Sequence, residues 1–439
     1  VHSTHPVLHV AGRKVEKIAK ESQEMKMSSK HIVIILLLLA SSATAQDQLN
    51  GYLKTAGENN PGLQARFKEY MAAMERVPQV GALPDPTVAF GYFILPPETR
   101  VGPQQFTTSL SQSFPWFGLL GAQEDVATEV AKSKLEVFEE ERSRLFYDVK
   151  SAYYDLYFVQ KGIDITRENL DILSTFLQLA LIKFESGSGS AVDELRVEME
   201  IADLEDQLAY LLDSQYELQV KFNNLLNVAD DSPISIPADL WAEVMVYDRT
   251  ALMDSIALQN HRIKQIEHLV LSWKEQERVA KKMGLPKFTV GVDYTVVGKS
   301  DNPALSAGEN GRDILLLPKV GITIPLYRKK YKAMVNEAVY RMDAAGLEKE
   351  DKINQLSTLF EKGYKDFRDG ERRVTLYINQ LDLAEKSLDI LLAEYSTDGR
   401  NFEEVLRMER KVLKYELELD KAKADKNASV AFIYYLMGN

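Results

Sequence analysis

The chain has 439 residues and no cysteine, which excludes disulfide bonds, thiol chemistry and zinc–thiolate sites. Its formal net charge of −12 argues against a nucleic-acid partner, because binding to phosphates requires a clustered positive field. Charged residues at 27% and hydrophobic residues at 45% are the proportions of an ordinary folded protein.

Residues 1–45 have the layout of an upstream extension followed by a secretory signal peptide. Basic residues precede the apolar run Ile32–Ala40, and the small residues Ala43–Ala45 suit a cleavage site. A run of about nine apolar residues is too short to span a bilayer as a helix. We expect the mature chain to begin near Gln46, and the residues before Met25 to come from a start codon placed too far upstream.

The second half of the mature sequence repeats the first at an offset of about 211 residues. Tyr153–Leu156 is echoed by Tyr364–Phe367, and Leu225–Leu226 by Leu436–Met437. Two similar units therefore share one chain. The expected divisions are a first repeat over 46–229, a linker over 230–246 and a second repeat over 247–439.

Each repeat is expected to open with a helix and a strand hairpin. The helices cover 48–79 and 249–282. The strands of the first hairpin (86–115) cover 87–94 and 106–114, and those of the second (287–325) cover 288–296 and 319–324. Apolar side chains alternate with small or polar ones along these strands, which suits a barrel wall between lipid and water. The same alternation fits a soluble antiparallel sheet covered on its apolar face. Extra residues of the second repeat fall in the hairpin loop 298–312.

After the signal peptide no apolar run reaches the length of a membrane helix, so a membrane-crossing part would have to be built from strands. Asp293 and Lys319 stand on the small-residue faces of the predicted strands. In a barrel these two residues would line the lumen. In a soluble sheet they would simply lie on the surface.

A long helical hairpin is predicted to follow each strand pair. In the first hairpin the outgoing helix covers 119–183 and the chain turns at a tip over 185–191. In the second hairpin the outgoing helix covers 329–394 and the chain turns at 396–401. A helix of some 65 residues extends on the order of 100 Å, longer than a compact domain. Apolar residues of the first helix recur at spacings of four and three, which is a coiled-coil seam. The seam residues are Leu145, Val149, Ala152, Leu156, Val159 and Ile163.

Neither part can complete itself within one chain. Helices with sparse seams cannot bury themselves alone, and four strands cannot close a barrel without exposed edges. Assembly around an axis would solve both problems. A trimer would join four strands from each chain into one twelve-stranded barrel, within the range of outer-membrane barrels, and pack the helices into a hollow cylinder.

The sequence resembles the TolC family of outer membrane efflux proteins over essentially the whole mature chain. The resemblance rests on Leu83–Pro86 before the first strand, on Gln112–Gly118 at the exit of the second, and on the two tip turns. It implies a mainly α-helical fold with a membrane β-barrel portion, in which duplicated helical hairpins of a homotrimer form a periplasmic tunnel. The Pro-Asp-Pro and Phe-Pro-Trp-Phe-Gly patterns resemble the heavy-metal efflux branch more than the multidrug branch.

The tip turns need residues that permit a tight reversal between antiparallel helices. Gly187 and Ser190 belong to the first turn, and Asp398, Gly399 and Asn401 to the second. Glycine adopts the required backbone conformation, and a serine oxygen can accept from free amides at the start of the returning helix. Turn and cap is the plain structural interpretation of these residues.

The family resemblance implies a gate at the same tips, where a lock links the second helical hairpin to the neighbouring protomer. On matching positions, Tyr395 and Arg400 would face Asp193, and Glu404 would lie in an acidic ring around the aperture. Contact between Arg400 and Asp193 would be a charge-assisted one that breaks on opening. The chain departs from the pattern at Arg407, which stands where the family's best-known member has a second acidic residue and could neutralise Glu404 within the chain.

The residues do not assemble into an enzyme, a cofactor site or a metal site. His261 and His268 lie about two helical turns apart, roughly 10 Å along the axis, too far to share one metal or proton. Two functions from different classes are compatible with the sequence. The first is a passive outer-membrane duct of a tripartite system, served by a periplasmic adaptor and an inner-membrane pump. The second is a secreted coiled-coil scaffold or adhesin with a small soluble sheet.

Overall fold

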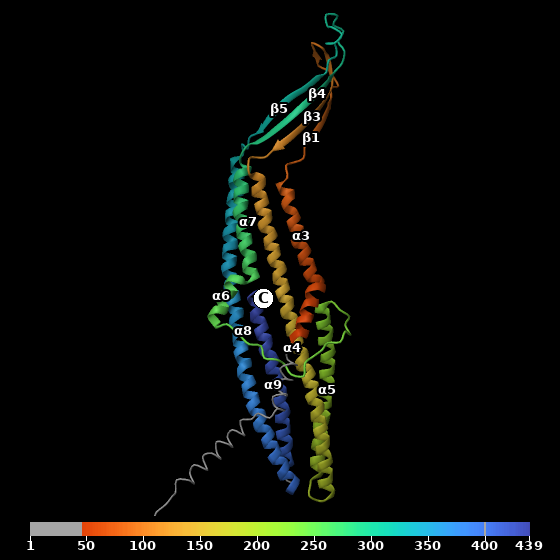
Figure 1. Ribbon diagram of the computed structural model, residues 1–439, viewed down its shortest axis with the longest axis vertical. Coiled ribbons are helices and arrows are strands. Elements are labelled where there is room, and N and C mark those ends of the chain that lie inside the picture. The colour runs from red at the N-terminus through yellow and green to blue at the C-terminus, as the bar shows by residue number, and fades with distance from the viewer. Residues whose placement is uncertain (1–45, 399–400) are drawn as a thin grey trace, which may run out of the picture. The chain divides into compact units, whose positions relative to one another are not determined.

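The structure is a computed structural model that describes residues 46–398 and 401–439 (Figure 1). The predicted signal peptide and upstream extension lie outside the described residues. The described chain divides into two compact units. The first comprises residues 46–60, 146–246 and 363–432, and the second comprises 61–145, 247–362 and 433–439. Each unit therefore takes segments from both sequence repeats.

The helix predicted at the start of each repeat is interrupted at an asparagine. In the first repeat a helix over 46–59 stops at Asn60, and α3 follows over Pro61–Gly81. In the second, α6 (Arg249–Gln259) stops at Asn260 before α7 (His261–Met283). Pro61 disfavours helical backbone at the residue before it. Asn260 leaves the helical conformation and caps α7, because its side-chain oxygen accepts from the amide of Arg262 at 3.0 Å.

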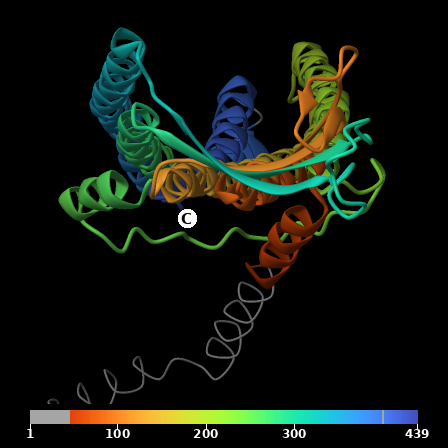
Figure 2. The same cartoon turned by 90° about the horizontal axis from the view of Figure 1, so that it is seen from above.

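The predicted strand hairpins form one antiparallel sheet with the order β1-β3-β4-β5, seen as a curved layer in Figure 2. The strands are β1 (Thr87–Tyr92), β2 (Glu98–Thr99), β3 (Gly102–Phe114), β4 (Lys287–Val297) and β5 (Ile314–Thr323). The short β2, which pairs with β3, was not predicted. β5 begins five residues before its predicted start because its first part pairs across a bulge between Asp293 and Tyr294.

The strand register gives the sheet one apolar and one polar face. Val88, Leu110 and Val292 stand in one cross-strand row, and Ala89, Ser109 and Asp293 in the next. Large apolar side chains on the first face are exposed within this single chain. They include Val88, Phe90, Tyr92, Leu110, Val290, Val320 and Ile322. The predicted alternation is therefore confirmed along β1, β3 and β4 and over residues 318–323 of β5.

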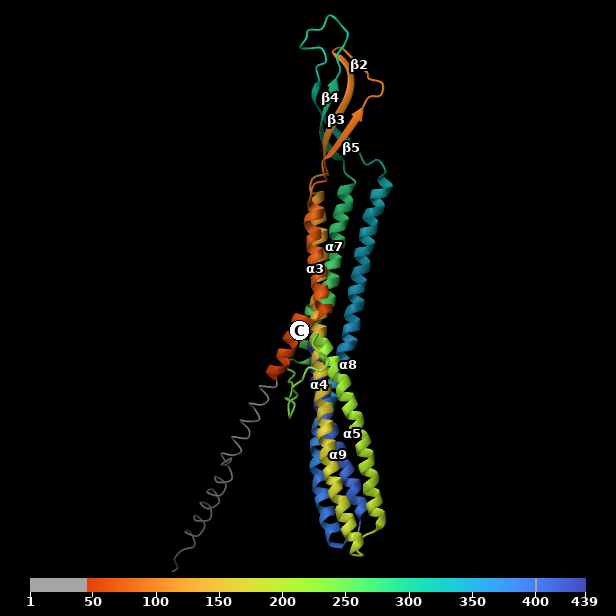
Figure 3. The ribbon, with the colours of Figure 1, turned by 90° about the vertical axis from the view of Figure 1, so that its right-hand side faces the viewer.

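The predicted long helical hairpins are confirmed. The first consists of α4 (Leu119–Glu185) and α5 (Ala191–Leu226), and the second of α8 (Arg328–Asp398) and α9 (Phe402–Leu436). In the first compact unit the two hairpins lie side by side with both turns at the same end (Figure 3). Among the described residues, no helix combines the length and apolar character needed to cross a membrane.

The linker between the repeats packs on the tyrosine motif that the repeats share. Tyr153 and Tyr157 are buried, and the hydroxyl of Tyr153 donates to the carbonyl of Ser235 at 3.1 Å. Asn427 of α9 holds the next part of the linker, donating to the carbonyl of Trp241 at 2.7 Å. These contacts fix the end of each hairpin opposite its tip.

Candidate gate at the helical tips

The first tip is a tight turn held by its own backbone. Gly187 adopts a positive φ of 71°, and the amide of Ser188 donates to the carbonyl of Lys183 at 2.9 Å. Ser190 begins α5, because its side-chain oxygen accepts from the amide of Val192 at 3.2 Å. Gly187 and Ser190 thus act as turn and cap residues.

The second tip differs from the first at the start of its returning helix. Asn401 adopts a left-handed φ of 66°, and its carbonyl accepts from the amide of Glu404 at 2.9 Å. Asp398 is the last residue of α8. Residues 396–398, predicted as part of the turn, thus still belong to α8, because the helix continues for one more turn than expected. Gly399 and Arg400 lie outside the described residues. The Lys183 ammonium donates to the carbonyl of Ser396 at 2.7 Å and so joins the two tips.

Tyr395 is part of the apolar core between the two hairpins. Its side chain is fully buried, and its ring centroid lies 4.6 Å from that of Phe402. The tyrosine hydroxyl has no hydrogen-bond partner among the described residues. Burial raises the pKa of Tyr395, and the nearby charge of Asp193 adds to this effect. The core around it also contains Leu173, Phe176, Ala180, Val197, Val405 and Leu406.

A ladder of alternating charges runs beside this core from α5 to α9. Asp193 lies 3.6 Å from Arg196, and Arg196 reaches Glu403 at 3.2 Å. Glu403 also contacts Arg410 at 3.4 Å, and Arg410 contacts Glu200 at 3.3 Å. Each arginine thus bridges two carboxylates. The sequence analysis did not find this ladder, because its members belong to different hairpins.

Glu404 forms an ion pair with Arg407, one helical turn further along α9. The positive charge of Arg407 therefore lies beside Glu404, the predicted aperture residue. The structure therefore brings Tyr395 close to Asp193 within one chain, while Glu404 faces Arg407. The lock and aperture roles of these residues stay predictions.

A buried carboxyl lies deeper along α9. Glu409 is 4% exposed, and its Oε2 atom has no partner among the described residues. It lines a cavity of about 20 Å³ together with Asn169, whose Oδ1 atom is also buried and unpartnered. Burial raises the pKa of Glu409 to about 7. Seven residues on, burial and the charges of Glu168 and Glu409 raise the pKa of Glu416 to about 7 as well.

Asp293 and Lys319, the two predicted lumen residues, form an ion pair at 2.6 Å on the polar face of the sheet. They come from the adjacent strands β4 and β5, and Lys319 stands two residues along β5 from the position that pairs with Asp293. Within the described residues there is no group of three or more histidine, aspartate or glutamate side chains that could hold a metal ion.

Known structures share this architecture. The outer-membrane channel OprN aligns with a TM-score of 0.73 and 17% identity, covering 89% of this chain and 90% of OprN. CusC aligns with a TM-score of 0.73 and 16% identity over 90% of this chain and 92% of CusC. The outer membrane protein VceC from Vibrio cholerae aligns with a TM-score of 0.72 and 14% identity over 91% and 98%. At such low identities these likenesses establish the fold.

Comparison with curated proteins gives no match. A family model does match the first repeat: residues 52–228 fit the one described as "Outer membrane efflux protein". The match ends close to the predicted end of the first repeat, and the second repeat has the same order of helix, strands and helical hairpin. Over residues 52–228 the chain therefore matches the family of outer membrane efflux proteins, and its fold over both repeats is that of the outer-membrane channels above.

Proposed function

We propose that the chain is the outer membrane channel of a tripartite efflux or secretion system. It would conduct solutes passively from a periplasmic adaptor and an inner-membrane pump to the exterior. OprN is described as an outer-membrane channel, and so is MtrE of Neisseria gonorrhoeae. The match to this family favours a duct without catalytic chemistry, in which the pump supplies the energy.

The open sheet carries this proposal. Its edge strands β1 and β5 each pair with one neighbour in the main sheet, and its apolar face is exposed. An apolar sheet with free edges would aggregate in water unless lipid covered the face and other strands paired with the edges. Three copies would supply twelve strands, with the apolar face toward lipid. Asp293 and Lys319 would then line the lumen.

The long helix α8 supports assembly into a homotrimer. Leu376, Leu383 and Ile390 follow one another at seven-residue spacing, and all three are exposed in the single chain. Such a stripe matches the seam of a coiled coil that lacks its partner helix. We infer that the partner is a helix of a neighbouring copy.

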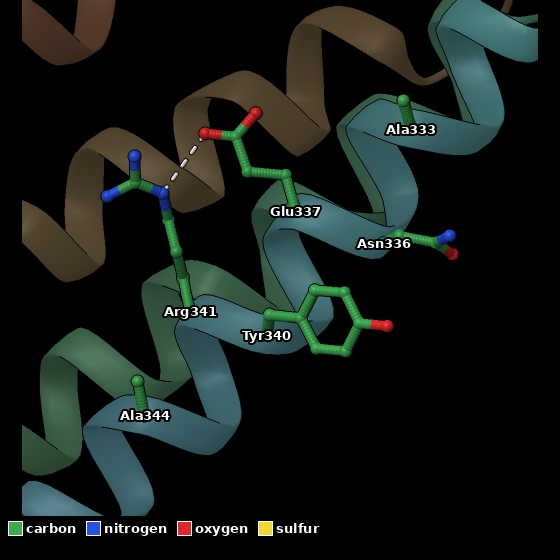
Figure 4. Close-up of a pocket in the computed structure, with 6 residues that line it drawn as sticks. All are labelled: Ala333, Asn336, Glu337, Tyr340, Arg341 and Ala344. Carbon is green, nitrogen blue, oxygen red and sulfur yellow. Dashed lines mark hydrogen bonds and ion pairs between the residues drawn. The ribbon is translucent and has the colours of Figure 1, made fainter.

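A groove on the N-terminal half of α8 could also receive a helix of a neighbouring copy. It is lined by Ala333, Tyr340 and Ala344, with Glu337 and Arg341 joined in an ion pair along its side (Figure 4). The Tyr340 side chain is 71% exposed. Small residues beside a large exposed ring would accept side chains of an adjacent helix in a knobs-into-holes manner.

The tips would form the gate of the channel. Asp193, Tyr395, Arg400 and Glu404 are the proposed lock and aperture residues. Packing of Phe402 against Phe176 of α4, together with the charge ladder, would hold the second hairpin against the first in the closed state. Opening would then require charged contacts to break, which solvent can replace at modest cost.

Reconstitution in planar bilayers tests the channel. Heat-modifiable trimers in the outer-membrane fraction with stepwise ion conductance are expected. A soluble elongated oligomer without conductance would support the scaffold or adhesin instead.

The trimer contact has its own test. Leu383→Asp places a charge in the proposed seam and should abolish trimers, whereas Leu258→Asp makes the same change at an exposed leucine of α6 and should leave them intact. Equal assembly of the two variants would contradict the α8 contact.

A further inference from the structure

His261 sits between two hydrogen-bond acceptors. Its Nδ1 atom lies 2.6 Å from Oε2 of Glu136 on α4, and its Nε2 atom lies 3.1 Å from the carbonyl oxygen of Gly438, just beyond α9. A neutral imidazole has one donor and one acceptor nitrogen, and a carbonyl oxygen can only accept. Nε2 must therefore carry a hydrogen. Nδ1 can then contact the glutamate only if a second proton lies between His261 and Glu136.

We propose that His261, Glu136 and Gly438 form a proton-dependent latch on the C-terminal end of α9. The latch is closed while the histidine–glutamate pair holds its shared proton, on either the imidazole or the carboxyl group. When that proton is lost, the imidazole keeps one hydrogen, and the Glu136 carboxylate holds this hydrogen on Nδ1, because a lone pair there would face the negative charge. Nε2 then becomes an acceptor opposite the Gly438 carbonyl oxygen, and this contact breaks. The closed latch ties α4, α7 and the end of α9 together, and the open latch leaves Gly438 without this donor.

The polar contacts next to His261 do not depend on its shared proton. On the same helix, Arg262 contacts Glu140 at 2.6 Å and the hydroxyl of Tyr435 at 2.7 Å. Tyr435 in turn donates to Glu140 at 2.7 Å. Burial, with the hydrogen bond to Glu140, raises the pKa of Tyr435, so it stays a neutral donor at physiological pH. This second contact between α7 and α9 therefore does not depend on the proton.

Other charged groups nearby are already engaged. Glu129 lies one heptad from Glu136 on α4 and contacts Nδ1 of His268 at 2.8 Å and the ammonium of Lys132 at 2.8 Å. Hydrogen bonds to these two partners hold the pKa of Glu129 below its usual value despite the opposing effect of burial. Arg144 on α4 contacts Glu141. Among the described residues His268 contacts one acceptor and His261 contacts two, so only His261 needs a second proton to make its contacts.

The first repeat holds a matched latch that cannot titrate. There Pro61 follows Asn60 where His261 follows Asn260, and Asn227 occupies the place of Gly438. Asn227 donates its side-chain amide to the carbonyl of Asn59 at 3.2 Å. Both cap residues have positive φ, 53° for Asn227 and 85° for Gly438. One molecule thus contains a pH-sensitive latch and an insensitive equivalent.

Hydrogen exchange on the full-length protein tests the latch. The amides of Gly438 and Asn439, which donate to carbonyls of α9, report the second repeat, and those of Asn227 and Val228 report the first. After correction for intrinsic exchange, raising the pH from about 6 to about 9 should lower protection of Gly438 and Asn439 by roughly tenfold, the typical effect of one charge-assisted bond. Protection of Asn227 and Val228 should not change.

Two variants distinguish the effect of the shared proton from a general loss of folding. Glu136→Gln supplies an amide that can donate to Nδ1 of neutral His261, so protection should stay high at every pH. His261→Gln removes the two-sided donor, so protection should stay low at every pH. The proposal is overturned if the pH dependence survives in His261→Gln, or if the two repeats lose protection in parallel in the wild-type protein.

Discussion

Asn260 donates its side-chain amide to the main-chain carbonyl of Leu436 at 2.8 Å. Asn60 makes the same bond to Leu225 at 3.0 Å, and Leu225 is the residue that Leu436 repeats in the sequence. In both repeats this bond anchors the end of the returning helix at the point where the first helix is interrupted. The duplication therefore preserves a tertiary contact as well as the order of elements.

Asn260→Ala should destabilise the protein by about 2–4 kcal/mol. The substitution removes the cap of α7, worth about 1 kcal/mol, and leaves the buried carbonyl of Leu436 without this donor, which costs about 1–3 kcal/mol. Guanidinium unfolding followed by helical circular dichroism measures the change. Lys274→Ala, at an exposed position of α7, is the control and should have little effect. An equal effect of both would argue against the anchor.

Glu409→Gln should remove part of the pH dependence of stability. The pKa of Glu409 is raised by burial from 4.5 to about 7 in the folded chain. Between these values the folded state holds a proton that the unfolded state has lost, so the free energy of unfolding falls as pH rises and levels off above about 7. The variant should be more stable than wild type at pH 8 by on the order of 2–3 kcal/mol.

The control for this titration is Glu198→Gln, because Glu198 is exposed on α5. It should keep the wild-type slope. Glu416, whose pKa is also raised to about 7, remains in the Glu409→Gln protein and should preserve part of the slope. Wild-type pH dependence in Glu409→Gln would mean that the buried carboxyl is already ionised when folded.

Much of the fold could be predicted from periodicity because each element repeats a clear pattern. The seam over Leu145–Ile163 and the alternation over Phe288–Val296 specify one face each. The start of β5 was missed for a local reason. Residues 314–317 are an unbroken apolar run followed by Pro318, which hides the two-residue period, and proline is tolerated there because β5 is an edge strand.

The site was less accessible to sequence reasoning. Tyr395 and Asp193 came from family resemblance, since spacing cannot show that two residues of different hairpins meet. Glu409 did carry a signal that was overlooked: it lies seven residues after Phe402 on the same apolar stripe of α9, and so does Glu416 after Glu409. An acidic residue at a seam position predicts a buried carboxyl.

Tyr395→Phe and Tyr395→Ala should separate packing from hydrogen bonding at the gate. The hydroxyl has no partner among the described residues, so its removal should change stability by less than about 1 kcal/mol and leave conductance unchanged. Truncation to alanine opens a cavity beside Phe402, costs about 3–5 kcal/mol and should raise conductance. A leaky Tyr395→Phe channel would show instead that the hydroxyl takes part in the lock.

The charge ladder should make the closed gate sensitive to salt. Glu403→Gln leaves Arg196 and Arg410 without their shared carboxylate, although the two arginines keep Asp193 and Glu200. Exposed pairs are worth less than about 1 kcal/mol each, and screening shortens their range from about 10 Å at 0.1 M salt to about 3 Å at 1 M. The variant should therefore raise single-channel conductance relative to wild type at 0.1 M salt, and the conductances of the two channels should converge at 1 M.

The control is Glu198→Gln, which removes the same charge from an exposed position of α5 outside the ladder and should match wild type at both concentrations. If Glu198→Gln produced the same increase, net charge at the tip would control the gate, and the specific contacts of Glu403 would not.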